Sequence, residues 1–106
     1  MDSLTDLYQE INERQQKPKT GSYTAYLFEK GLDKILKKVG EESTEVVIAA
    51  KNQDNAELVA ESADLLYHLL VLFVQQGVSL AEIEEELVRR QGLVSQTKER
   101  RTIDDL

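Results

Sequence analysis

Apolar residues recur along this chain every three or four positions, which is the spacing of amphipathic α-helices. No segment shows the strict alternation of apolar and polar residues that is typical of a half-buried β-strand. The pattern therefore predicts an all-α protein with a four-helix-bundle-like core. About five helices are expected, over residues 3–15, 23–30, 32–51, 56–76 and 79–92.

Capping residues and helix breakers set the expected boundaries of these helices. Ser3, with Asp6 three residues later, is expected to cap the first helix weakly, and Ser79 with Glu82 forms a clear capping box. The only proline lies in residues 17–22 together with a glycine, which predicts a loop. Breaks or helix ends are also expected at Gly31, in the turn of residues 52–55, and at Gly77 and Gly92.

The fourth predicted helix is apolar on nearly all sides between Leu65 and Val74, so we expect it to be buried on most sides. In the fifth helix, Leu80, Ile83 and Leu87 are expected to face inward. A monomer of this size can hardly cover a helix that is apolar all round. We therefore predict a homodimer of C₂ symmetry, with the fourth helix partly buried across or beside the interface.

The composition indicates one small acidic domain. The 106 residues are enough for one hydrophobic core, which we assign to residues 1–95, with a charged tail over residues 96–106. Thirteen basic and twenty acidic residues give a net charge of -7, which argues against nucleic-acid binding. The longest purely apolar run, residues 69–74, is too short to cross a membrane. The lack of cysteine suits a reducing compartment, so we expect a cytoplasmic protein without a membrane partner.

Two groups of carboxylates on the central helices are the strongest candidates for chemistry. The first group is Glu41, Glu42 and Glu45, and the second is Glu61 and Asp64. On a helical wheel Glu42 lies at the edge of the apolar stripe, Glu61 lies inside one, and Glu41 points more nearly to solvent. Pairs spaced i, i+3 on antiparallel helices can face one point, where a divalent cation would relieve their repulsion. Oxygen ligands without cysteine favour Mg²⁺ or Mn²⁺, although solvated surface acids are the alternative interpretation.

Other candidate residues have a structural interpretation, and His68 and the lysines also have a functional one. His68, the only histidine, is either a core residue hydrogen-bonded to a neighbour or a member of the carboxylate site. Tyr67 is interpreted as packing. The lysines that precede the carboxylates, Lys37 and Lys38 among them, are either surface partners of acids or ligands for phosphate oxygens.

Several blocks of the sequence resemble one known family. The blocks are Ser22-Tyr23-Thr24, Lys30-Gly31-Leu32-Asp33-Lys34-Ile35, Lys37-Lys38-Val39-Gly40-Glu41-Glu42, Glu45-Val46-Val47-Ile48-Ala49-Ala50-Lys51 and Glu61-Ser62-Ala63-Asp64-Leu65-Leu66-Tyr67-His68. Together they are similar to phosphoribosyl-ATP pyrophosphatases, which belong to the MazG-type all-α nucleotide pyrophosphatases. The resemblance runs from about Leu4 to Arg90.

The resemblance implies a Mg²⁺-dependent enzyme of histidine biosynthesis. It implies that phosphoribosyl-ATP is hydrolysed at its α–β phosphoanhydride to phosphoribosyl-AMP and pyrophosphate, and it also implies a homodimer. The implied metal ligands are Glu42, Glu45, Glu61 and Asp64. Glu41 or a ligand carboxylate is a candidate for the general base, and Lys37, Lys38 and Lys51 are candidates for binding the outer phosphates. A house-cleaning dNTP pyrophosphatase of the same superfamily and a non-enzymatic acidic interaction module remain as alternatives.

Overall fold

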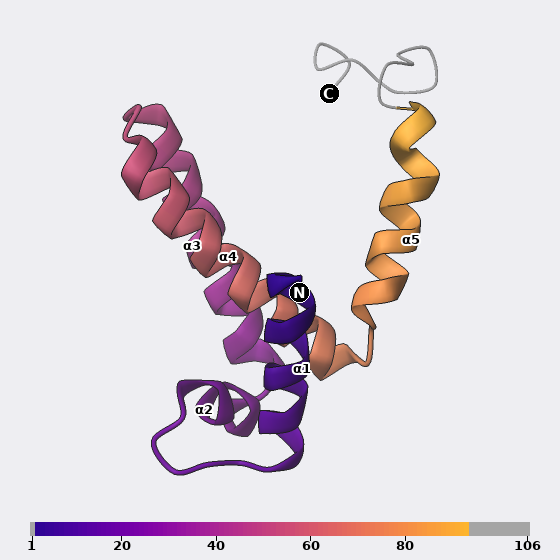
Figure 1. The fold of residues 1–106 in the computed structure, drawn as a ribbon. Coiled ribbons are helices and arrows are strands. Elements are labelled where there is room, and N and C mark those ends of the chain that lie inside the picture. The colour runs from indigo at the N-terminus through magenta and orange to yellow at the C-terminus, as the bar shows by residue number, and fades with distance from the viewer. Residues whose placement is uncertain (1, 94–106) are drawn as a thin grey trace.

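The structure is a computed structural model that describes residues 2–93, and it is all-α over that range (Figure 1). These residues contain no β-strand, as the sequence predicts. The helices are α1 (Ser3–Gln16), α2 (Tyr23–Lys30), α3 (Leu32–Lys51), α4 (Asn55–Gln76) and α5 (Leu80–Arg90), followed by a 3₁₀ turn at Gln91–Leu93. The predicted tail of residues 96–106, and with it the predicted domain boundary, lies outside the described residues.

Local capping explains most of the helix ends. Ser79 accepts a hydrogen bond from the Glu82 backbone N–H, and the Glu82 carboxylate accepts one from the Ser79 backbone N–H, so the predicted capping box is present. Gly31 joins α2 to α3 with a φ of 93°, a conformation that favours glycine. Gly77 ends α4 in the left-handed conformation.

Several predicted boundaries differ from the structure by one or two residues, among them the end of α1, at Gln16 rather than residue 15, and the start of α4, at Asn55 rather than residue 56. The residue that caps α1 is Asp2 rather than Ser3, because the Asp2 carboxylate accepts the Leu4 backbone N–H at 3.0 Å. The fifth helix ends at Arg90 instead of at Gly92, which lies within the following 3₁₀ turn.

The long helices α3 and α4 form an antiparallel hairpin, and α1 and α2 pack at the end of it that is opposite the α3–α4 turn (Figure 1). The hydrophobic core lies at this end. Its buried residues come from four helices and are Ile11, Leu27, Ile35, Leu70, Val71 and Val74. The other end of the hairpin projects from the core, so apolar side chains there are left exposed, including Val47 at 66% and Val59 at 71%.

Helix α5 stands apart from the hairpin and has no buried residue (Figure 1). Leu80, at its start, packs against the core, as expected. Leu87 is 60% exposed, so the expectation that it faces inward is wrong for the single chain. The reason is that the turn after Gly77 directs α5 away from the hairpin, so no helix within residues 2–76 packs along its apolar stripe.

The helices within residues 2–93 are too short or too polar to span a bilayer.

Candidate active site

The α3–α4 hairpin brings three of the predicted carboxylates together. Glu42 and Glu45 lie one turn apart on α3, and Glu61 lies opposite them on α4. One carboxylate oxygen from each of these three residues lies within 4.8 Å of the other two. We call Glu42, Glu45 and Glu61 the carboxylate cluster. The i, i+3 spacing on α3 and the short turn between the helices are sufficient to produce it.

Two oxygens of the carboxylate cluster are buried without a hydrogen-bond partner. They are Oε2 of Glu42 and Oε2 of Glu61. Glu42 as a whole is only 6% exposed. Buried polar atoms in folded proteins almost always have partners, and a buried acceptor without one costs free energy. A divalent cation would supply the missing partner to both oxygens, so the cluster fits such an ion.

The three carboxylates titrate unequally because they lie so close together. A hydrogen bond with Glu45, together with desolvation and the Glu45 charge, raises the pKa of Glu61 to about 7. Desolvation by burial also raises the pKa of Glu42. Hydrogen bonds from Glu61 and Glu42 lower the pKa of Glu45, which lies between them. In the metal-free cluster Glu42 and Glu61 therefore bind protons more readily than free glutamates do, as expected for carboxylates that compete for one site.

Lys38 is the one predicted cation that the structure brings to the carboxylate cluster. Its Nζ lies 3.5 Å from Glu42 Oε1 and 3.6 Å from Glu41 Oε1, one turn along α3 in each case. Glu41 itself is exposed and lies outside the cluster. Lys37 and Lys51 are also exposed, and within residues 2–93 neither forms an ion pair.

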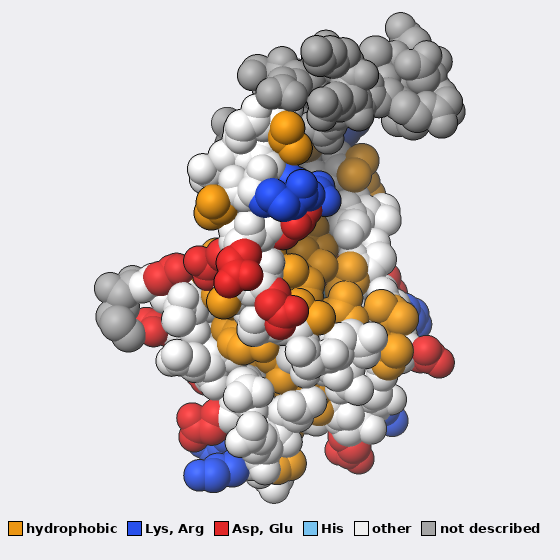
Figure 2. Space-filling view, turned by 90° about the vertical axis from the view of Figure 1, so that its right-hand side faces the viewer, with side chains coloured by type: hydrophobic (Ala, Val, Ile, Leu, Met, Phe, Trp, Pro, Cys, Tyr) orange, Lys and Arg blue, Asp and Glu red, His pale blue; other side chains and the backbone are white. Residues whose placement is uncertain are grey.

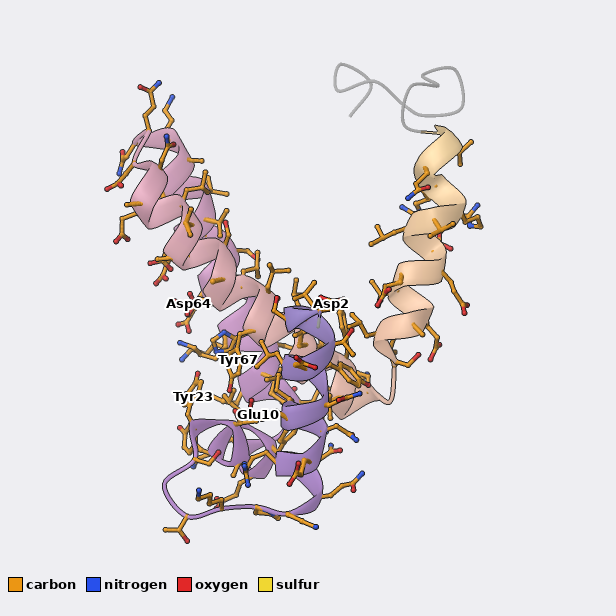
Figure 3. All side chains as sticks on the ribbon, in the orientation of Figure 1. Asp2, Glu10, Tyr23, Asp64 and Tyr67 are labelled. Carbon is orange, nitrogen blue, oxygen red and sulfur yellow. The ribbon has the colours of Figure 1, made fainter. Side chains whose placement is uncertain are left out.

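Asp64 lies near the cluster without joining it. Its side chain is exposed and projects from α4 on the side of the molecule that also carries Tyr23 (Figure 3). Its carboxylate contributes to the electrostatic field at Glu42 and at Glu61. Asp64 follows Glu61 by one turn of α4, so the two carboxylates project from the same face of the helix, and the role of Asp64 as a fourth ligand stays a prediction.

A network of aromatic side chains borders the carboxylate cluster. The Tyr23 hydroxyl lies 3.0 Å from Nε2 of His68, and Nδ1 of His68 lies 2.8 Å from the backbone oxygen of Asp64. The Thr24 hydroxyl is hydrogen-bonded to the Tyr67 hydroxyl. His68 is 4% exposed, which agrees with its interpretation as a core histidine bonded to a neighbour. Sequence reasoning gave Tyr23 no role, because no spacing pattern connects two residues 45 positions apart.

Two hollows lie near these groups. A hollow of about 160 Å³ between α3 and α4 is lined by Glu45 and Glu61 of the carboxylate cluster and also by Asp54 and Glu57. A larger hollow of about 1030 Å³ lies between α2 and the loop of residues 17–22, and its lining includes Tyr23 but no member of the cluster.

Fold and site together define an all-α protein whose clustered carboxylates, contributed by two antiparallel helices, suit a divalent cation. Comparison with known proteins gives the family. The profile of the family described as phosphoribosyl-ATP pyrophosphohydrolase matches residues 4–91. The chain belongs to this family, which confirms the resemblance seen in the sequence and places the chain among hydrolases.

Curated relatives match over their whole length. A phosphoribosyl-ATP pyrophosphatase of Listeria welshimeri is 63% identical over 103 residues, which are 97% of this chain and 99% of the relative. Proteins of the same name from Limosilactobacillus fermentum and Lactiplantibacillus plantarum are 60% and 58% identical over 106 residues, the full length of each pair. The matched regions include every member of the carboxylate cluster.

Proposed function

We propose that this chain hydrolyses the α–β phosphoanhydride of phosphoribosyl-ATP, yielding phosphoribosyl-AMP and pyrophosphate in the second step of histidine biosynthesis. The observation that carries the proposal is the carboxylate cluster, with its two buried and unpartnered oxygens, in a chain of this family. Because substrate and products are metabolites of the cell interior, we propose a cytoplasmic location.

The carboxylate cluster is proposed to hold Mg²⁺, with Mn²⁺ as a possible substitute. Glu42, Glu45 and Glu61 would supply one oxygen each, and Asp64 would supply a further one. When bound, the ion would neutralise phosphate charge and lower the pKa of a coordinated water. The burial of Glu42 limits water around it, so its carboxylate is held in one orientation before substrate arrives.

Cationic and basic roles are proposed for residues around the cluster. Lys38 already lies beside Glu42, so its ammonium can move from the carboxylates to a phosphate oxygen of the substrate. Lys37 and Lys51 are exposed and can reach outer phosphates. Glu41, which lies outside the cluster but forms an ion pair with Lys38, is the proposed acceptor of the proton from the attacking water.

The substrate is tested by measuring pyrophosphate release from phosphoribosyl-ATP and from a panel of dNTPs at saturating Mg²⁺. We expect kcat/KM for phosphoribosyl-ATP to exceed that for every dNTP. A preference for dNTPs would show that the chain is a house-cleaning dNTP pyrophosphatase instead. Lack of pyrophosphate release from both substrate classes would contradict the proposed function.

We further propose that the chain forms a homodimer. The exposed apolar residues at the projecting end of the hairpin and on α5 support it, and they are Val47, Ile48, Val59, Leu66, Leu87 and Val88. Figure 2 shows apolar side chains gathered on one face of the molecule. A second copy would cover such surfaces, which isolated monomers rarely expose. Light scattering of the wild-type protein at micromolar concentration should give twice the monomer mass. Ile48→Glu should reduce this mass to that of one monomer. A monomeric wild-type protein would contradict the proposal.

A further inference from the structure

The bond between Tyr23 and His68 fixes an exposed side chain by means of a buried one. Tyr23 is the first residue of α2 and is 46% exposed, whereas His68, on α4, is 4% exposed. Their ring centroids lie 5.8 Å apart in an edge-to-face arrangement, and the Tyr23 ring also lies against Tyr67. An exposed tyrosine is normally free to change rotamer, so three contacts that hold one in place require an explanation.

The hydrogen-bond pattern determines which atom carries each proton. A backbone carbonyl only accepts, so Nδ1 of His68 must donate its hydrogen to the Asp64 oxygen. In the neutral ring Nε2 is then an acceptor, and the Tyr23 hydroxyl donates to it. Burial raises the pKa of the Tyr23 phenol, which keeps that proton in place. The phenolic oxygen is left with lone pairs only, so its next partner must be a donor.

Tyr23 lies on the side of the molecule that also carries Asp64, the predicted fourth ligand (Figure 3). Lys38, Glu42 and Asp64 are all close enough to influence the Tyr23 hydroxyl electrostatically. Figure 3 shows Asp64, Tyr67 and Tyr23 in sequence along the same side of the molecule. When the α- and β-phosphates of a nucleotide lie at the carboxylate cluster, its ribose lies next to the cluster, because the 5′ oxygen joins it to the α-phosphorus. The ribose offers hydroxyl donors and an apolar face, which are the two features that a tyrosine with an accepting oxygen recognises.

We propose that Tyr23 contacts the ribose attached to the triphosphate of the substrate, accepting a hydrogen bond from one of its hydroxyls, and that His68 is the positioning residue that holds Tyr23. This inference rests on the proposed function. The other explanation of the network is purely structural, with Tyr23 and His68 fastening α2 to α4. The two explanations differ in what Tyr23→Phe does to substrate affinity.

Tyr23→Phe keeps the ring and removes the hydroxyl. We expect KM for phosphoribosyl-ATP to rise about tenfold, the effect of one lost hydrogen bond, with kcat changed by less than about twofold. Mg²⁺ affinity measured without nucleotide should stay unchanged. The matched control is Tyr26→Phe, one turn later on α2 and 39% exposed, whose hydroxyl has no partner among the described residues. This control should leave KM unchanged.

His68 is tested by rescue and by a double mutant. His68→Gln offers an amide oxygen to the Tyr23 hydroxyl, so it should keep KM closer to wild type than His68→Leu does. The double variant of Tyr23→Phe and His68→Leu should show no higher KM than the worse single variant, because both remove one interaction. Additive increases in KM would overturn the positioning role.

The sugar contact is identified with two analogues of phosphoribosyl-ATP, which lack the 2′ or the 3′ hydroxyl of the ribose attached to the triphosphate. The difference in KM between wild type and Tyr23→Phe should disappear with one of the two. A difference that persists with both analogues, or a loss of Mg²⁺ affinity in Tyr23→Phe, would overturn the ribose assignment. Lower melting temperatures with an unchanged KM would show a structural role only. If wild-type protein does not turn over phosphoribosyl-ATP, the proposed function fails, which is a result distinct from all of these.

Discussion

Replacing Glu42 by glutamine should stabilise the metal-free protein. Glutamine keeps the shape of the side chain, removes a buried charge, and can donate its amide hydrogens to Glu45. Leaving a buried acceptor such as Oε2 of Glu42 without a partner costs about 1–3 kcal/mol. The opposing loss is the ion pair with the partly exposed Lys38, which contributes about 1 kcal/mol or less. The net gain is about 1 kcal/mol, equivalent to a rise in melting temperature of about 5 °C.

The assay is a thermal melt at pH 7.5 and fixed protein concentration, first with a chelator and then with added Mg²⁺. Without metal, Glu42→Gln should melt above wild type. With Mg²⁺, wild type should gain more than the variant, because the variant has lost a charged ligand. Glu41→Gln, an exposed neighbour on the same helix, is the control and should change stability by less than about 0.5 kcal/mol. A lower melting temperature for Glu42→Gln without metal would refute the reasoning that the buried Glu42 carboxylate lacks partners that offset the cost of its burial.

Three further predictions concern pH, the core and a helix cap. Because the pKa of Glu61 is raised to about 7, the folded state keeps a proton at pH values where the unfolded chain has lost it. The stability of the metal-free protein should therefore fall from pH 5 to pH 7.5. In a series of thermal melts, the melting temperature of Glu61→Gln should depend less on pH than that of wild type. Leu27→Ala removes a fully buried side chain and should cost about 2–5 kcal/mol in urea unfolding, and a smaller loss would mean that the site collapses around the cavity. Ser79→Ala removes the cap of α5 and should cost about 1 kcal/mol in the same assay, and Ser79→Asp should restore most of it.

The helices could be predicted from the sequence because their signals are local. The Ser79–Glu82 box and the glycines at 31 and 77 act within one turn of the chain, and all three appear where expected. The position of α5 could not be predicted in this way. The apolar stripe that includes Leu87 indicates that one face needs cover, but it does not indicate whether the cover comes from the same chain or another.

The candidate site could also be predicted only where it depends on local spacing. The i, i+3 spacing and the short turn between α3 and α4 are enough to bring Glu42, Glu45 and Glu61 together. The helical wheel placed Glu42 only at the edge of the apolar stripe, whereas packing against neighbouring helices buries it. The bond from Tyr23 to His68 depends on how α2 folds back onto α4, a tertiary contact that a one-dimensional pattern cannot contain.

Turnover of phosphoribosyl-ATP by Glu61→Gln tests most directly whether the carboxylate cluster is the catalytic metal site. Pyrophosphate release should be abolished, because the ion would lose an anionic ligand, while the metal-free melting temperature should stay at or above that of wild type. Glu84→Gln, an exposed acid on α5, is the control and should leave both values unchanged. Near-normal turnover by Glu61→Gln would contradict the assignment of the carboxylate cluster as the metal site.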